Sequence, residues 1–320
     1  MVSRQRSRRR WLVIGGIVSI AAGVLLAFVR PWSPPPSVPK SEGIPAEWRT
    51  PPAPASPPAL EVVDADEEEP LDAGAPAATA VRPLSDVLPV GYVQAGRLVY
   101  DLDGRRVAEE EYRLVRRNAA TVNLTSSGRF FFRVLFVTVS VSFDQEIEWG
   151  PDLSPRSYTL EARGPLGFGN QRIAARVEGG VATVTVGNDE RELPLPEGNA
   201  LFAGTLAAYV VLPALYAARA EDGVLPLATI GVATGPGGRS GASTGGDGTG
   251  ELRWHGVVEV DAGGTAVVLD RYWAQTGAFG GTLLARGSEF VALLGEGERV
   301  LTAFRADLFP RGVGPLGVRR

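Results

Sequence analysis

The chain has 320 residues, with one Met, one His and no Cys, and 31 of its 32 basic residues are arginine. The absence of Cys excludes disulfides, thiol nucleophiles, Cys-type metal sites and a lipidated N-terminal cysteine. One His excludes a multi-His metal cluster, and the single lysine, Lys40, leaves no Walker-type phosphate loop. The composition therefore predicts no metal and no cofactor.

Charge divides the sequence into three parts. Residues 1–30 hold six arginines and no acidic residue, residues 31–79 hold two basic and nine acidic residues, and residues 80–320 carry a net charge of −3. A nucleic-acid site needs a basic surface, and no basic block follows the N-terminal tail. We therefore expect no nucleic-acid partner.

The segment Trp11–Val29 contains 19 residues without a charge. As a helix it spans about 28 Å, close to the thickness of a bilayer core. Residues 1–10 before it contain five arginines, and short basic flanks stay in the cytoplasm. The sequence predicts a basic cytoplasmic tail over 1–10 and a single transmembrane helix over 11–29. The membrane is then the cytoplasmic (inner) one, and the C-terminal domain lies outside, in the periplasm or at the cell exterior.

A cleaved signal peptide is the alternative for this segment, because the run from Ser7 to Leu12 resembles a twin-arginine export signal. The apolar run is longer than the usual core of a signal peptide, and it ends in Phe28-Val29-Arg30-Pro31 without a small-x-small cleavage site. These two features favour an uncleaved anchor.

Residues 30–89 have the composition of a disordered stalk. Residues 31–58 contain 11 of the 25 prolines, and an acidic run follows from Glu61 to Asp72. Proline fixes φ and lacks an amide hydrogen, and neighbouring like charges repel, so both halves favour an extended chain. We interpret the segment as a spacer, with docking of a proline motif to a partner as the alternative.

The pattern of the remaining domain, 90–310, is mainly β, followed by a flexible tail over 311–320. Apolar and polar residues alternate most clearly along Val137–Asp144, which is typical of a strand with one covered face. Asp103-Gly104 and Gly179-Gly180 predict tight hairpin turns. Gly263-Gly264 and the glycines around Glu296 predict two more near the C-terminus.

The segment from Asn199 to about Ala220 does not show the alternating pattern of a strand. Asn199 is a helix-capping residue, and an Ala- and Leu-rich run follows it to about Ala220, with Pro213 expected to kink it. A helix this apolar must be buried, so we predict a curved antiparallel sheet (half-barrel or clam) wrapped around one long helix. A second transmembrane span is the alternative. The glycine-rich stretch 235–250 predicts a surface loop.

Residues suited to catalysis are few. His255 lies on a predicted strand without a nearby G-x-S-x-G nucleophile motif, so we interpret it as a structural or surface residue. Alternate residues share one face of a strand, which makes Glu109/Glu111 and Glu146/Glu148 same-side carboxylate pairs of the kind glycoside hydrolysis uses. Solvated strand faces often carry such pairs, so we predict no catalytic residues and no enzyme.

Three motifs carry a resemblance to a family. Gly96–Gly104 followed by Ala108–Tyr112 resembles the opening hairpin of an uncharacterised family of bacterial periplasmic β-clam proteins. Leu153–Tyr158 is similar to its "L-x-P-x-x-Y" strand, and Ala214–Arg219 to the "L-Y-x-x-R" end of its central helix. That family distantly resembles lipoprotein-carrier-like proteins. The resemblance implies an apolar concavity suited to an acyl chain or lipoprotein.

The function we expect is a membrane-anchored cell-envelope protein with an extracytoplasmic β-clam domain that binds lipid or lipoprotein. The alternative is a non-catalytic structural or assembly protein that uses the β domain to dock a protein partner, whose identity the sequence leaves open. The ligand cavity is predicted to be lined by apolar residues of the strands and the helix: Leu98, Tyr100, Val139, Val141, Phe143, Leu206 and Tyr209.

Overall fold

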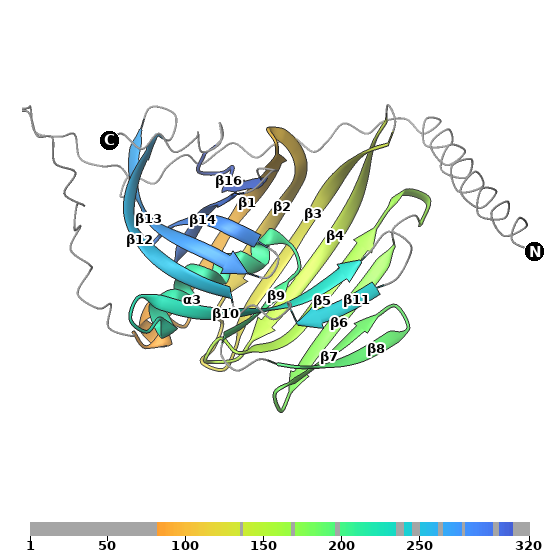
Figure 1. Cartoon of the computed structure of the whole chain (residues 1–320), viewed down its shortest axis with the longest axis horizontal. Coiled ribbons are helices and arrows are strands. Elements are labelled where there is room, and N and C mark those ends of the chain that lie inside the picture. Colours follow the sequence, from red (N-terminus) through yellow and green to blue (C-terminus); the bar gives the residue numbers. More distant parts are fainter. Residues whose placement is uncertain are drawn as a thin grey trace, which may run out of the picture.

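The structure is a computed structural model that describes residues 82–134, 137–167, 170–195, 199–234, 240–244, 250–261, 265–276, 279–296 and 301–309. Within these residues the fold is mainly β, as the alternating pattern predicted (Figure 1). The anchor over 11–29 and the stalk up to residue 81 lie outside the described residues. In the part that is described, no helix has the length and apolar character needed to cross a membrane.

The first half of the sheet is built from long neighbouring hairpins. Its strands are β1 (Val93–Leu102), β2 (Arg105–Val115), β3 (Val122–Val134), β4 (Val137–Trp149), β5 (Pro155–Arg163), β6 (Gln171–Glu178), β7 (Val181–Val186) and β8 (Asp189–Pro194). The predicted turns at Asp103-Gly104 and Gly179-Gly180 are confirmed, and all three glycines and Asp103 adopt positive φ.

The second half starts with a short strand and a helical insert. Its elements are β9 (Asn199–Ala203), the 3-10 helix η3 (Leu206–Val211), α3 (Leu212–Arg219), β10 (Val224–Thr234), β11 (Ser240–Thr244), β12 (Gly250–Asp261), β13 (Ala266–Thr276), β14 (Phe279–Arg286), β15 (Glu289–Gly295) and β16 (Leu301–Arg305). The short helix α2 (Leu84–Val87) precedes β1, and η2 (Pro165–Gly167) lies between β5 and β6.

All sixteen strands belong to one sheet in the order β11-β10-β12-β13-β14-β15-β16-β1-β2-β3-β4-β5-β6-β7-β8, with β9 beside β10. The neighbouring pairs are antiparallel except β9 and β10, which run parallel. β1 and β16 join the two halves, so the ends of the described chain meet in the middle of the sheet. The sheet is curved, so the edge strands β8 and β11 approach each other. Among the described residues, β8 and β11 do not pair, so the sheet is not a closed barrel.

The curved sheet surrounds the helical insert, which fills its interior. Tyr209, Leu212 and Leu215 of η3 and α3 are buried in one cluster with inward side chains of both halves of the sheet, such as Leu114 and Leu283. Figure 1 shows α3 between the two halves. Alternation along each strand produces this core, because every second side chain points inward.

The predicted long helix over 200–220 is wrong. Residues 199–203 form β9 instead, with the Asn199 amide donating to the Pro226 carbonyl at 3.1 Å, so Asn199 is a strand residue and not a cap. α3 begins only at Leu212 and has eight residues. Pro213 lies in its first turn, where a missing amide hydrogen costs nothing, so this proline starts the helix and does not kink it.

Two other expectations need correction. Residues 82–89, predicted to be the end of the disordered stalk, pack on the domain: Leu84–Val87 form α2, Leu88 is buried, and the Arg82 amide donates to the Ala217 carbonyl at 3.2 Å.

The second expectation that needs correction is the glycine-rich loop over 235–250. Residues Ser240–Thr244 form β11 and pair with β10, so a strand interrupts the stretch. On the outer face of β1 and β12–β16 a second apolar cluster is covered by Leu308 and Phe309. Strands β1 and β13–β16 therefore contribute to apolar clusters on both faces of the sheet, whereas the outward residues of β3 and β4 are mostly polar.

Candidate functional site

The β3–β4 hairpin continues beyond its pairing with β2 and β5. β3 pairs with β2 only as far as Phe130, which lies opposite Ala108, and β4 pairs with β5 only from Ser142 onward. Among the described residues, the strand segments 131–134 and 137–140 pair only with each other, and Figure 1 shows the hairpin extending past β5 and β6. A two-stranded ribbon without flanking strands exposes both of its faces.

Three phenylalanines run along the inward side of this hairpin from the core to the solvent. Phe143 is 1% exposed and Phe132 is 51% exposed. Phe130 lies between them, partly buried, with its ring centroid 4.6 Å from that of Phe143 and 6.4 Å from that of Phe132. Apolar contact is therefore continuous from the interior to the exposed ring.

We call Phe143, Phe130 and Phe132 the phenylalanine ladder. Gly128 makes room for the buried ring of this ladder. It lies opposite Phe143 in β4 and Glu110 in β2. A Cβ at this position would lie 2.6 Å from the Phe143 ring and 2.3 Å from the carbonyl oxygen of Glu109. Only glycine allows the Phe143 ring to cross β3 this closely.

The valines opposite these rings complete an apolar surface. Val141 lies opposite Phe130 and Val139 opposite Phe132, and both valines are partly exposed. Directly opposite residues point to the same side of the sheet. We call the surface formed by Phe130, Phe132, Val139 and Val141 the lip. It is an apolar patch at one end of the sheet, of the kind that marks interaction sites.

The structure divides the seven residues predicted to line a cavity into two groups. Val139, Val141 and Phe143 lie on the projecting hairpin, next to Phe130 and Phe132. The remaining four belong to the interior around η3, where three are buried and Leu206 is partly buried: Leu98, Tyr100, Leu206 and Tyr209. Sequence reasoning missed Phe130 and Phe132, although the run Arg129-Phe-Phe-Phe-Arg133 is the most aromatic stretch of the chain.

A buried carboxyl fastens the helical insert to the sheet. Glu110 is 1% exposed and accepts hydrogen bonds from the hydroxyls of Tyr100 and Thr205 and from the amide of Ala207, the last two at 2.5 and 3.3 Å. Burial raises the pKa of the Glu110 carboxyl to about 7, partly offset by hydrogen bonds from Ser126, Thr205 and Ala207. These donors occupy both carboxyl oxygens, which favours a structural role.

The same segment is held from β4 as well. The Gln145 side chain accepts from the Thr205 amide at 2.9 Å and donates to the Ser126 hydroxyl at 3.3 Å. Together with Glu110, these bonds tie the start of η3 to β2, β3 and β4. The insert is thus a fixed part of the interior.

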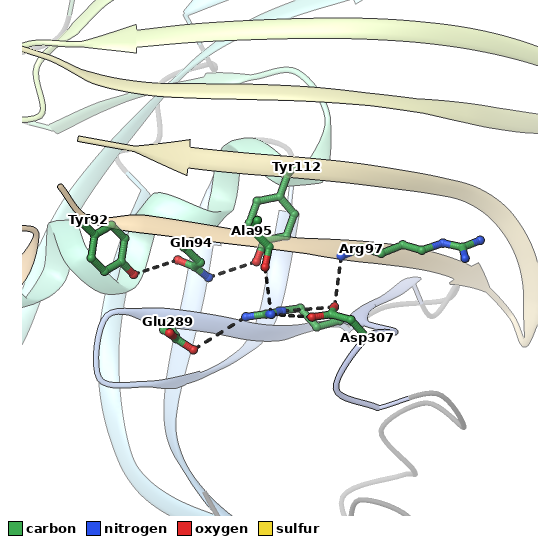
Figure 2. Close-up of polar contacts among 8 residues, drawn as sticks. Tyr92, Gln94, Ala95, Arg97, Tyr112, Glu289 and Asp307 are labelled. Atoms are coloured by element: carbon green, nitrogen blue, oxygen red, sulfur yellow. Dashed lines mark hydrogen bonds and ion pairs between the residues drawn. The ribbon is translucent and has the colours of Figure 1, made fainter. Parts of the chain in front are cut away.

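Arg305 forms the second buried polar cluster, at the junction of β1 and β16 (Figure 2). Its side chain is 8% exposed, donates to the Ala95 carbonyl at 3.0 Å and to Asp307 at 2.5 Å, and lies 3.8 Å from Glu289. A Cβ on Gly96 would lie 2.7 Å from the Arg305 Nε atom, so the glycine makes room for the guanidinium.

Further contacts continue this cluster along the inner face of β1. Figure 2 shows the chain of contacts from Tyr92 through Gln94 to Tyr112, in which the Gln94 amide donates to the Tyr112 hydroxyl at 3.1 Å. Burial raises the pKa of Tyr112 well above its ordinary value. Because the guanidinium is already matched by two carboxylates and a carbonyl, we interpret the cluster as a structural junction.

A cleft of about 610 Å³ lies at the other end of the molecule from the lip. Its acidic groups already have partners, because Asp270 accepts from Trp254 at 3.4 Å and from the Gly287 amide at 3.2 Å. Tyr216 and Tyr272 meet edge to face with centroids 4.9 Å apart, and both are largely buried. The remaining lining is mixed in charge: Arg82, Asp86, Arg286 and Glu289.

The carboxylates considered for catalysis do not form an isolated acid pair. Glu109 binds Arg97 at 2.5 Å, and Glu148 lies 3.7 Å from Arg156. His255 is exposed on β12, as expected for a surface residue. The described residues contain no group of three or more His, Asp or Glu side chains placed to hold a metal ion.

Comparison with known proteins gives only distant structural neighbours. No family model matches the chain, and no curated protein matches it. A β-barrel-like protein of a domain of unknown function, DUF1849, from Brucella abortus is 12% identical, with a TM-score of 0.41, over 68% of this chain and 97% of that one. A DUF1089 family protein from Pseudomonas aeruginosa is 13% identical, with a TM-score of 0.32, over 57% of this chain and 86% of that one.

Proposed function

We propose that the protein is a single-pass, membrane-tethered component of the cell envelope whose extracytoplasmic β domain binds lipid or the acyl part of a lipoprotein. The observation that carries this proposal is the lip, an exposed apolar surface continuous with the core through Phe130 and Phe143. Its partly exposed aromatic and branched side chains suit an alkyl chain laid across them.

The sequence supports the same ligand class in two further ways. The uncharged segment 11–29 predicts a bilayer anchor, which would keep the domain beside its ligand's source. The motifs at Gly96–Gly104 with Ala108–Tyr112, Leu153–Tyr158 and Ala214–Arg219 resemble an uncharacterised periplasmic β-clam family. That family distantly resembles lipoprotein-carrier-like proteins, which implies an acyl ligand. We propose a non-enzymatic binding role, because the reactive side chains described above are engaged in structural contacts.

Because η3 and α3 fill the interior with packed apolar side chains, we place the ligand at the lip and not around the helix. The interior residues Leu98, Tyr100, Leu206 and Tyr209 would then support the fold. The hairpin residues Val139, Val141 and Phe143 would support or contact the ligand.

The test uses the full chain in detergent and a fluorescent fatty-acid analogue. Phe132→Ser should lower the bound fluorescence, whereas Val257→Ser, at a residue that is 62% exposed on β12, should leave it unchanged. Both variants retain the same anchor, so a difference between them reports the lip alone. Equal binding by the wild type and both variants would refute lipid binding at the lip.

The packed interior also favours a second candidate, a structural or assembly protein that docks a protein partner through its β domain. A photoreactive residue introduced at position 132 in cells separates the two candidates. Cross-links to lipid support the first proposal, and a defined cross-linked protein band supports the second.

A further inference from the structure

We propose that the lip inserts into the interfacial layer of the bilayer to which the chain is tethered, so that the domain contacts the membrane at a second point. This inference rests on the proposed function for the tether and names the bilayer surface as the occupant of the lip. It begins from exposure: Phe132 is 51% exposed at the projecting end of the hairpin, and Phe131, on the opposite face of β3, is partly exposed.

The shape of the hairpin suits insertion. Among the described residues, the segments 131–134 and 137–140 pair only with each other, so they form a narrow ribbon. One face of this ribbon carries the lip, and the other carries Phe131 with the exposed Thr138 and Ser140. Segments that lie in the membrane interface carry residues such as Phe and Leu on the face buried at the boundary between headgroups and acyl chains. A projecting ribbon reaches that layer without moving the rest of the sheet.

Charge at the hairpin complements an anionic lipid surface. The strand segments from Arg129 to Val134 and from Val137 to Ser142 contain two arginines, Arg129 and Arg133, and no acidic residue. Arg129 is exposed. Arginine near an anionic leaflet adds electrostatic attraction to the apolar contact.

The chain is long enough for the lip to return to its own bilayer. β1 begins at Val93, which lies at the end of the sheet opposite the hairpin tip, because Val93 pairs with Val115 and Val115 with Asn123. β3 has 13 residues, a length of about 40 Å. The part of the stalk before the described residues, 30–81, can extend to roughly 170 Å, several times that length.

A second copy of the chain is the less suitable occupant. Stable protein interfaces bury about 800 Å² on each partner. The lip offers four apolar side chains, of which Phe132 is more than half exposed and the others less. Insertion between lipid headgroups needs no matching surface and suits a small patch better.

The absence of cysteine from the chain allows a clean experiment on the full-length protein. Phe132→Cys and, as a matched control, Val257→Cys each provide one labelling site, and both native side chains are exposed apolar residues of strands. Each variant is labelled with an environment-sensitive fluorophore and reconstituted through its anchor into vesicles of phosphatidylcholine and phosphatidylglycerol. A fraction of the lipid carries a spin label on its acyl chain as a quencher.

The expected result is a blue-shifted emission at position 132 that the acyl spin label quenches strongly, with no quenching at position 257. Replacing phosphatidylglycerol by phosphatidylcholine should weaken the quenching at 132. Unquenched emission at 132 would overturn insertion, and a blue shift without quenching would assign the lip to a protein surface. Fatty-acid binding in detergent is measured separately, so lost insertion with retained fatty-acid binding refutes this inference and leaves the proposed function in place.

Discussion

Glu110 and Phe132 lie on neighbouring strands and break the usual distribution of polar and apolar residues in opposite directions. The Glu110 carboxyl is buried but surrounded by donors from Tyr100, Thr205 and Ala207. The Phe132 ring is apolar but more than half exposed, and its described contacts lie on one side, toward Phe130. The buried polar group therefore has a structural explanation inside the molecule, whereas the exposed apolar group points to something outside it.

This contrast separates residues that hold the fold from residues that are available for binding. A buried group that loses its partners destabilises the fold, because its desolvation is no longer offset. An exposed ring can be removed at little cost to the fold. The two regions should thus respond oppositely in stability and in ligand binding.

The largest effect is expected at the buried end of the phenylalanine ladder. Phe143→Ala removes a ring that is 1% exposed and should lower the free energy of unfolding by about 4 kcal/mol. Urea unfolding of the full chain in detergent, followed by tryptophan fluorescence, measures this loss. A loss similar to that of Phe132→Ala would mean that the ladder does not run from core to surface.

Arg305→Met should lower the free energy of unfolding by nearly as much. The substitution keeps the length of the side chain but leaves Asp307 and the Ala95 carbonyl without their donor, and removing one partner of a buried ion pair costs about 3 kcal/mol. Arg129→Met, at an exposed arginine, is the control and should be close to neutral. Equal stability of the two variants would contradict the interpretation of Arg305 as a structural junction.

Glu110 predicts a pH dependence of stability. Its pKa is raised from 4.5 to about 7 in the folded chain, so the folded state binds the proton more tightly than the unfolded state. The resulting stabilisation is complete below pH 4.5 and is lost as the pH rises through 7, a change of up to about 3 kcal/mol. Glu110→Gln should flatten this part of the profile, which urea unfolding between pH 4 and 8 measures. An unchanged slope in the variant would assign the dependence to other groups.

The smallest effect on stability is expected at the lip. Phe132→Ser should change the free energy of unfolding by less than about 0.5 kcal/mol, because the ring is exposed in the folded state. Binding of the fatty-acid analogue should nevertheless fall. If stability falls by as much as in Phe143→Ala, the ring is part of the core and the proposed division between fold and binding fails.

Much of the sheet could be predicted from the sequence, because alternation and turn residues act locally. Asp103-Gly104 and Gly179-Gly180 predict their hairpins correctly for this reason. The helical insert could not be predicted in the same way. Its apolar run reads as one helix, but pairing of residues 199–203 with β10 competes successfully with helix formation, and Pro213 fixes the later start at Leu212.

Only part of the candidate site could be predicted from the sequence. Val139, Val141 and Phe143 stand out by alternation, and the structure places them on the hairpin that carries the lip. Alternation cannot show that β3 and β4 continue beyond their pairing with β2 and β5, since that depends on the register of four strands. For the same reason Glu110 appears in the sequence as one acid among three, Glu109–Glu111, and only the burial pattern distinguishes it.

The most direct test of the lip as the binding surface is to map where a photoreactive fatty acid attaches. The full chain is irradiated with a diazirine fatty acid, digested with trypsin and analysed by peptide mass spectrometry. The lip lies on two tryptic peptides, 130–133 and 134–156. Our account predicts that, outside the anchor, these two peptides carry the adduct, and that Phe132→Ser reduces it. Adducts on residues 206–219, with residues 130–156 unmodified, would place the ligand around the helical insert and contradict the account.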